Sequence, residues 1–209
     1  MPGKRPCCTF VQTINDQAKS GLTAAKPVRL SRSWLSSLIL LCMNNYDFVL
    51  SLRAIRGYGE QPISSEHMAA ILEAARWTGS SKNKQNWAFV VVTEREQLER
   101  VAACGRFTDP VRNSAATIVI VEEPGGNEFD SGRVAQNIML AAKAVGVASC
   151  PITLHHRERA GAVVDLGEGR TCQYAVALGY PLPGAEPAVL GGRKPLAELV
   201  HWQSYGSNR

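Results

Sequence analysis

Hydrophobic and polar positions alternate between helix-like and strand-like patterns from residue 43 onward. Apolar residues at helical spacing predict a short helix over 46–58 that stops at Gly57 and Gly59, and a second helix from Ser64 or Ser65 to Gly79. The β-branched and aromatic run 87–93 predicts a buried strand. Further helices are predicted at 94–104, 131–146 and 155–167, and further strands at 116–123, 147–152 and 171–181.

The order of these elements predicts an α+β fold. Helices and strands alternate, but the strands are few, which favours a small sheet covered by helices over a full doubly wound fold. In the longest predicted helix, Val134, Ile138, Ala141 and Val145 are expected to face the core. No shift in composition divides residues 43–209, so one domain is expected there.

Residues 1–42 have a different composition, basic, rich in serine and nearly free of acids. They contain six Lys or Arg and one acid, which accounts for the whole net charge of +5. This favours a disordered extension, with Met43 as the start of the folded chain; a targeting segment remains open as an alternative. The apolar run 34–42 is shorter than the roughly 20 residues of a membrane-spanning helix, so no membrane partner is expected.

Charge and cysteine content exclude several classes of function. After residue 42 the basic and acidic residues are equal in number, so no nucleic-acid partner is implied. The six cysteines have neither metal-site spacing nor the density of a secreted disulfide scaffold, which favours a reducing, cytoplasmic setting. Cys104, Cys150 and Cys172 lie in apolar runs and are expected in the core. The adjacent His155 and His156 are expected at the surface, and no metal site is predicted.

Three polar segments remain as candidates for binding. The chain has no G-x-G-x-x-G, no phosphate loop and no G-x-S-x-G motif. Arg53 and Arg56 in LRAIR, three residues apart, would share one face of the first helix. Arg193 and Lys194 in GGRKPL offer donors that suit a small phosphate. Each segment alone is also compatible with a solvated face.

The third segment is the loop SSKNKQNW, residues 80–87. Its hydroxyl and amide side chains suit the donors and acceptors of a planar heterocycle or a polyol. An ordinary helix-to-strand turn would have a similar composition. The candidate binding residues are Ser80, Ser81, Asn83 and Gln85.

Five segments, in order, carry a resemblance to a known family. They are LRAIR, ILEAARWTGSSKNKQNWAFVVV, RVAQNIMLAAKAVGVAS, VALGYP and GGRKPLAELVHW. Together they make residues 43–206 similar to the nitroreductase family of FMN-dependent oxidoreductases. The resemblance implies a nitroreductase-like fold with a small mixed or antiparallel sheet, assembled as an intertwined homodimer.

The resemblance also implies roles for individual residues. Arg53, Arg193 and Lys194 would hold the FMN phosphate, and Arg56 would stabilise charge on the flavin ring as the catalytic cation. The loop 80–85 would reach the FMN of the neighbouring subunit. The flavin would also contact Ala54 and, near its N5 position, Pro151, Ile152 and Thr153. Leu52, Ala54 and Asn86 stand where Arg, Ser and Pro are usual.

The implied activity is NAD(P)H-dependent reduction of nitroaromatics, quinones or a related small acceptor, by ping-pong hydride transfer through flavin N5. NADH or NADPH would be the electron donor. Two alternatives remain open. One is a protein that binds or sequesters flavin with little turnover, and the other is a different flavin reaction such as dehydrogenation, dehalogenation or flavin fragmentation.

Overall fold

The computed structural model describes residues 44–187 and 192–207 of the 209-residue chain. The chain forms two units, residues 1–52 and residues 53–209. In the first unit the described part contains helix α3 (Asn45–Leu50), which Asn44 caps by accepting a hydrogen bond from the Asp47 N–H at 2.9 Å. The expectations for the extension 1–42 and for Met43 lie outside the described residues.

The first predicted helix is wrong over its second half, because α3 ends at Leu50 and residues 52–57 are not helical. Instead, the Ile55 N–H donates to the Ser149 carbonyl at 3.0 Å, and Tyr58 pairs with Pro181 in an isolated bridge. Pairing with distant backbone therefore replaces the helical hydrogen bonds that the local pattern favoured. Arg53 and Arg56 lie on this non-helical segment and share no helix face.

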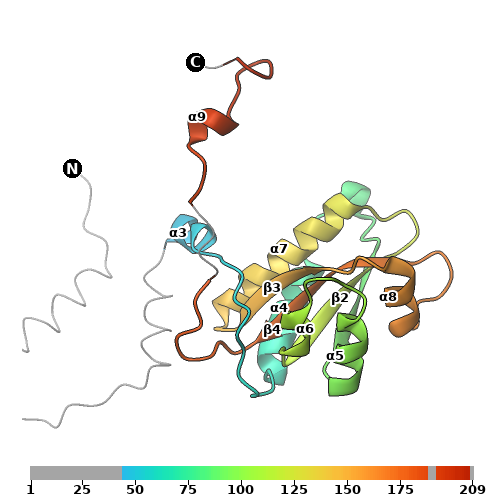
Figure 1. Ribbon diagram of the computed structural model, residues 1–209. Coiled ribbons are helices and arrows are strands. Elements are labelled where there is room, and N and C mark those ends of the chain that lie inside the picture. The colour runs from blue at the N-terminus through green and yellow to red at the C-terminus, as the bar shows by residue number, and fades with distance from the viewer. Residues whose placement is uncertain (1–43, 188–191, 208–209) are drawn as a thin grey trace, which may run out of the picture. The chain divides into compact units, whose positions relative to one another are not determined.

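The second unit is built on a four-stranded sheet that is antiparallel at every pair (Figure 1). Its order is β1-β2-β4-β3, with β1 (Trp87–Val92), β2 (Ala116–Glu122), β3 (Ala148–Thr153) and β4 (Thr171–Gly179). All four predicted strands are thus confirmed. The expected burial of the first is wrong, because β1 lies at an edge of the sheet with most of its side chains only half-buried.

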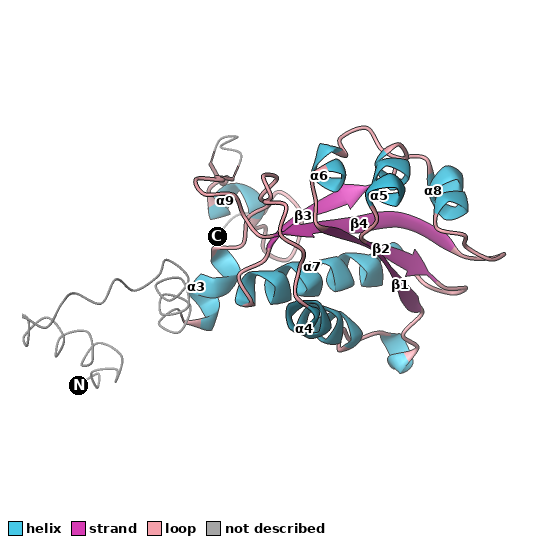
Figure 2. Ribbon diagram, turned by 90° about the horizontal axis from the view of Figure 1, so that it is seen from below, coloured by secondary structure: helices cyan, strands magenta, loops and turns pink. Residues whose placement is uncertain are grey.

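Helices cover both faces of this sheet (Figure 2). The helix α7 (Glu128–Ala144) packs against the strands on one face, with α4 (Ser65–Arg76) packed on α7. The other face carries α5 (Arg95–Ala102), α6 (Asp109–Arg112) and α8 (Arg157–Val163). The short α6, α9 (Leu196–Leu199) and the 3-10 helix η1 (Ser81–Asn83) were not among the predicted elements.

The core forms where the alternating strand faces meet these helices. Val134 and Ile138 of α7 are completely buried, as predicted, whereas Ala141 and Val145 are only half-buried. The two central strands, β2 and β4, supply most of the buried strand residues. The predicted α+β class with a small sheet covered by helices is confirmed.

Candidate functional site

The outer edge of β3 is the centre of the candidate site. The Leu154 N–H donates to the Gln173 carbonyl of β4 at 2.7 Å, whereas the Ser149 carbonyl on the other side accepts from Ile55. Successive residues of an antiparallel strand point their backbone N–H and C=O groups to opposite sides. The backbone N–H of Thr153 must therefore point away from β4, on the same side as the Ser149 carbonyl. No described strand pairs with this side of β3. Beyond Ile55, the edge therefore presents the Thr153 N–H and an exposed Pro151.

Two cations lie near each other beside this edge. Arg53 is exposed and comes two residues before Ile55, while Lys143 lies in the last turn of α7. Burial lowers the pKa of Lys143, and the positive charge of Arg53 lowers it further. Two neighbouring positive charges of this kind suit a phosphate. Lys143 was not predicted as a site residue, because its approach to Arg53 arises only from tertiary packing.

Tyr58 fixes the segment that carries Arg56. A Cβ on Gly179 would lie 2.7 Å from the Tyr58 Cβ, so only glycine at 179 allows this approach. Burial raises the pKa of the Tyr58 hydroxyl, and the charge of Arg56 partly offsets this effect. Arg56 itself is exposed and lines a cavity of about 420 Å³ together with Gly57 and the turn 182–186. Ala54, in contrast, packs against the core.

The polar loop 80–85 is held by its own hydrogen bonds. The Ser80 Oγ accepts from the Gln85 N–H at 2.9 Å, and the Gln85 amide donates to the Asn83 Oδ1 at 3.1 Å. Lys82, Asn83 and Gln85 all have φ of 53° or 54°, a left-handed conformation that non-glycine residues seldom adopt. Such backbone strain is typical of functional loops.

Helix α7 anchors the start of this loop. The Asn137 side chain donates to the Thr78 hydroxyl at 2.8 Å, and the Arg133 guanidinium donates to the Gly79 carbonyl at 2.5 Å. Ser81, Asn83 and Gln85 follow this anchor, and their side chains are exposed.

One chain does not bring all the predicted site residues together. The loop 80–85 leads into β1, at one edge of the sheet, whereas Pro151, Ile152 and Thr153 lie on β3 at the other edge. Arg193 and Lys194 are exposed ahead of α9, and no hydrogen bond or ion pair joins them to another described residue. The structure therefore unites segment 53–56 with β3 and leaves the loop two strands away.

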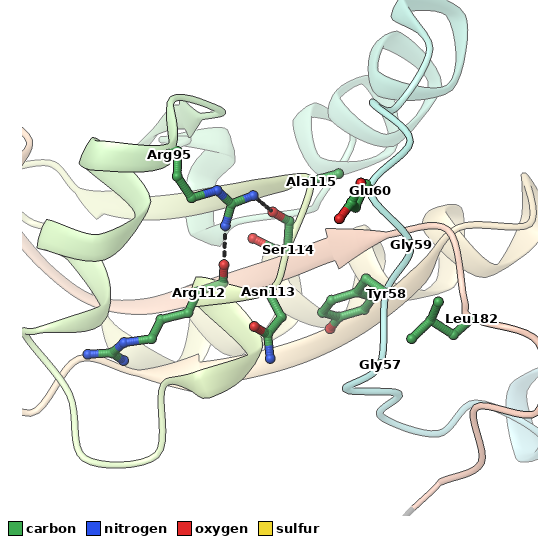
Figure 3. A pocket seen from close by; sticks show the side chains of 10 residues that line it. All are labelled: Gly57, Tyr58, Gly59, Glu60, Arg95, Arg112, Asn113, Ser114, Ala115 and Leu182. Carbon is green, nitrogen blue, oxygen red and sulfur yellow. Dashed lines mark hydrogen bonds between the residues drawn. The ribbon is translucent and has the colours of Figure 1, made fainter.

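A separate cavity of about 500 Å³ lies beside Tyr58, as Figure 3 shows. Arg95 forms part of its wall, donating to the carbonyls of Arg112 and Ser114 at the end of α6. This guanidinium therefore serves to cap backbone groups there. None of the residues predicted to bind FMN lines this cavity.

The cysteines and the two adjacent histidines differ in burial. Cys104, Cys150 and Cys172 are buried, and burial raises the pKa of each thiol, for Cys172 to about 11. His155 and His156 are exposed, and the described residues contain no group of three potential metal ligands. Within the same residues, no helix combines the length and apolar character needed to cross a membrane.

Comparison with known proteins defines the class. The family model described as the nitroreductase family matches residues 50–118. An Archaeoglobus fulgidus protein that carries the name NADH dehydrogenase/NAD(P)H nitroreductase is 32% identical over 144 residues, which cover 64% of this chain and 83% of the relative. The chain therefore belongs to the nitroreductase family, a class of oxidoreductases.

Solved structures share the fold. Nitroreductase A from Vibrio parahaemolyticus superposes with a TM-score of 0.71 at 24% identity, over 80% of this chain and 79% of that one. The NADPH:FMN oxidoreductase of Vibrio harveyi, solved with NAD+, gives a TM-score of 0.70 at 23% identity, over 78% and 79% of the two chains. The nitroreductase-like fold implied by the sequence resemblance is confirmed.

Proposed function

We propose that this chain binds FMN and uses NADH or NADPH to reduce nitroaromatics, quinones or a related small acceptor. The observation that carries the proposal is the outward edge of β3, where the Thr153 N–H lies next to a segment bearing Arg53 and Arg56. The names of the relatives, which include NAD(P)H nitroreductase and NADPH:FMN oxidoreductase, support the same activity.

The residues at this edge have the chemistry that FMN requires. A backbone N–H on an open strand edge is a fixed donor for a ring nitrogen of a planar heterocycle. Arg53, near Lys143, supplies positive charge for the phosphate, and Arg193 and Lys194 are assigned to the same group. FMN, when bound, supplies hydride transfer between a reduced pyridine nucleotide and an acceptor.

Arg56 has a different role in this proposal. A ring that accepts a hydride gains negative charge, and a guanidinium held near it stabilises that charge. Tyr58 holds the segment of Arg56 in place, because its ring packs on Gly179. Arg56 is therefore assigned to charge stabilisation, and Pro151 and Ile152 to the wall beside the ring.

The position of the loop 80–85 supports a homodimer as the active form. Its exposed Ser81, Asn83 and Gln85 lie at the edge of the sheet opposite β3, too far along the sheet to complete the site of their own chain. A second copy could supply them, since a symmetric dimer presents each surface twice. The polar side chains of the loop would then contact the FMN held by the partner.

Absorbance spectroscopy of the purified chain tests the proposal. The protein is expected to take up FMN and to bleach under anaerobic conditions when NADH or NADPH is added. Colour should return when a nitroarene or a quinone follows. Bleaching without return by any acceptor would instead favour a flavin-sequestering protein, and failure to take up FMN would exclude both.

A further inference from the structure

A second group of residues lies directly beyond Thr153, where the loop 105–107 packs against β3 and its continuation. A Cβ on Gly105 would lie 2.8 Å from the Thr153 carbonyl oxygen, so the two backbones are in close contact. The Arg106 N–H donates to His155 Nδ1 at 3.3 Å, and the rings of Phe107 and His155 meet edge to face at 6.4 Å. The loop and residues 153–155 therefore form one surface.

This surface carries more positive than negative charge. Residues 155–159 line a cavity of about 510 Å³, and their side chains include His155, His156, Arg157 and Arg159 but only one acid, Glu158. Arg157 is neutralised by Glu128, which lies 2.9 Å away and also accepts from the Tyr174 hydroxyl. Arg106 and Arg159, in contrast, form no ion pair with any residue in the described ranges 44–187 and 192–207.

Contacts with α5 and α7 hold helix α8 in place. The Gln97 side chain of α5 donates to the Val163 carbonyl at the end of α8 at 2.5 Å, and the Arg157–Glu128 pair joins the start of α8 to α7. Arg159 also lies close enough to Cys104 at the end of α5 for its charge to lower the pKa of that thiol, although burial raises it more.

His155 is oriented as a hydrogen-bond donor toward solvent. Its Nδ1 accepts the Arg106 N–H, so the proton of the neutral ring must be on Nε2. Thr153 and His155 are two positions apart along the chain, a distance of at most about 7 Å. A nicotinamide stacked on a ring at the Thr153 edge would therefore have an anionic group within reach of His155, inside the length of one dinucleotide.

We infer that Arg106, Arg159 and His155 bind a phosphate of the pyridine nucleotide while its nicotinamide stacks on a flavin ring held at the β3 edge. This inference rests on the proposed function and identifies which residues recognise the electron donor. Arginine and a ring N–H both donate to phosphate oxygens, and Arg106 and Arg159 are available for a ligand because no carboxylate of the described residues pairs with them.

A phosphate-free hydride donor provides the decisive comparison. The variant Arg106→Gln/Arg159→Gln is assayed for anaerobic flavin reduction with NADPH, with NADH and with 1-benzyl-1,4-dihydronicotinamide, which has the reacting ring but no phosphate. We expect the KM for NADPH to rise by about tenfold or more, with the constants for the phosphate-free donor unchanged. The control Arg76→Gln removes an exposed arginine that is paired to Glu73 on α4. It is expected to leave the KM for every hydride donor unchanged.

The two nucleotides distinguish which phosphate is bound. A rise in KM for NADPH alone indicates the 2′-phosphate, and an equal rise for NADH indicates the pyrophosphate; either supports the inference. Two results would overturn the inference. One is an equal loss of flavin reduction with NADPH and with the phosphate-free donor, and the other is a KM for NADPH in the double variant that equals the KM in Arg76→Gln.

Equilibrium binding gives a readout independent of turnover. Calorimetric titration with NADP+ should show affinity in the wild type that falls about tenfold in the double variant. Unchanged affinity would overturn the inference even if flavin reduction proceeds normally. If the wild-type protein takes up no FMN yet binds NADP+ through these residues, the proposed function fails while the nucleotide site stands.

Discussion

The outer edge of β3 and the polar loop 80–85 differ in what holds them in place. Segment 53–58 is fixed to the sheet by contacts between residues far apart in the sequence, such as Ile55 with Ser149 and Tyr58 with Gly179. The loop is held mainly by short-range bonds and by α7 at its start. The β3 edge thus forms with the global fold, whereas the loop can open locally without unfolding the sheet.

Their positions differ as well, since β2 and β4 separate the two edges. Under the proposed function each chain carries two half-sites, one preformed and one strained. A preformed half can hold a ligand with little ordering cost, while a strained half can adjust when a second copy approaches.

Mixing two impaired variants should restore part of the activity. Arg53→Ala damages the β3 edge, and Asn83→Ala/Gln85→Ala damages the loop. If each site combines the edge of one copy with the loop of another, refolding an equal mixture leaves about a quarter of the sites intact. Flavin reduction by NADPH is measured for each variant and for the mixture. Activity no greater than the average of the two variants would show that the halves do not come from different copies.

Arg53 and Arg56 should differ in what they contribute. Arg53→Ala is expected to weaken FMN binding by about tenfold to a hundredfold, because a charge-assisted hydrogen bond to phosphate is lost. Arg56→Ala should instead slow flavin reduction more than it weakens binding. Fluorescence titration gives the dissociation constant, and stopped-flow absorbance gives the reduction rate. Equal effects on both quantities in both variants would contradict the assigned roles.

Gly179→Ala should loosen the segment that carries the β3 half-site. The added methyl group would lie 2.7 Å from the Tyr58 Cβ, and such overpacking costs about 1–3 kcal/mol of unfolding free energy. The matched control is Gly132→Ala on α7, where nothing lies within 4 Å and alanine should stabilise the helix by roughly 0.5–1 kcal/mol. Urea unfolding measures both. The free energy of unfolding is expected to fall in Gly179→Ala and to rise in Gly132→Ala. A Gly179→Ala variant as stable as the wild type would show that the contact between Tyr58 and Gly179 is not tight.

Sequence patterns predicted the second unit better than the site within it. Strong apolar runs correctly placed all four strands, and Ser64, one of the two predicted starts of the second helix, caps α4 through its Oγ, which accepts the His67 N–H at 3.2 Å. Local spacing failed at Arg53 and Arg56, because the competing hydrogen bond from Ile55 to Ser149 joins residues that are far apart in the sequence. Lys143 gave no signal at all, since its role depends on where the end of α7 lies relative to Arg53.

The roles carried over from the family resemblance remain predictions. The structure brings Arg53, Ala54 and Arg56 to the strand that bears Pro151, Ile152 and Thr153, as a shared site requires. It leaves Ser80, Ser81, Asn83 and Gln85 at the opposite edge of the sheet, a separation that no pattern along one chain could reveal. Periodicity reports which side of an element faces the core, but it does not report which edges of a sheet meet across a dimer.

Ser80→Ala should affect the loop alone. The Ser80 Oγ accepts from the Gln85 N–H at 2.9 Å, and losing a bond of this kind costs about 1 kcal/mol. Hydrogen exchange at the Gln85 amide should therefore accelerate by about five- to tenfold, while the midpoint of urea unfolding stays unchanged. Ser81→Ala is the matched control, because its Oγ has no hydrogen bond with any other described residue. A shift in global stability for Ser80→Ala would show that the loop is part of the cooperative core.

Acid should break the side-chain hydrogen bonds at the end of α4, just before the loop, and this is expected to have a small effect. Hydrogen bonds from Arg76 and from the Trp77 indole lower the pKa of Glu73 from its usual 4.5 to about 2. Because the folded pKa is the lower one, the stabilising contribution is complete above pH 4.5 and is lost as the pH falls toward 2. The Trp77 indole N–H resonance should therefore titrate in that window in the wild type and not in Glu73→Gln. The indole resonances of Trp87 and Trp202 serve as internal references, and a wild-type Trp77 signal that titrates only near pH 4.5 would mean that the pairing is absent in solution.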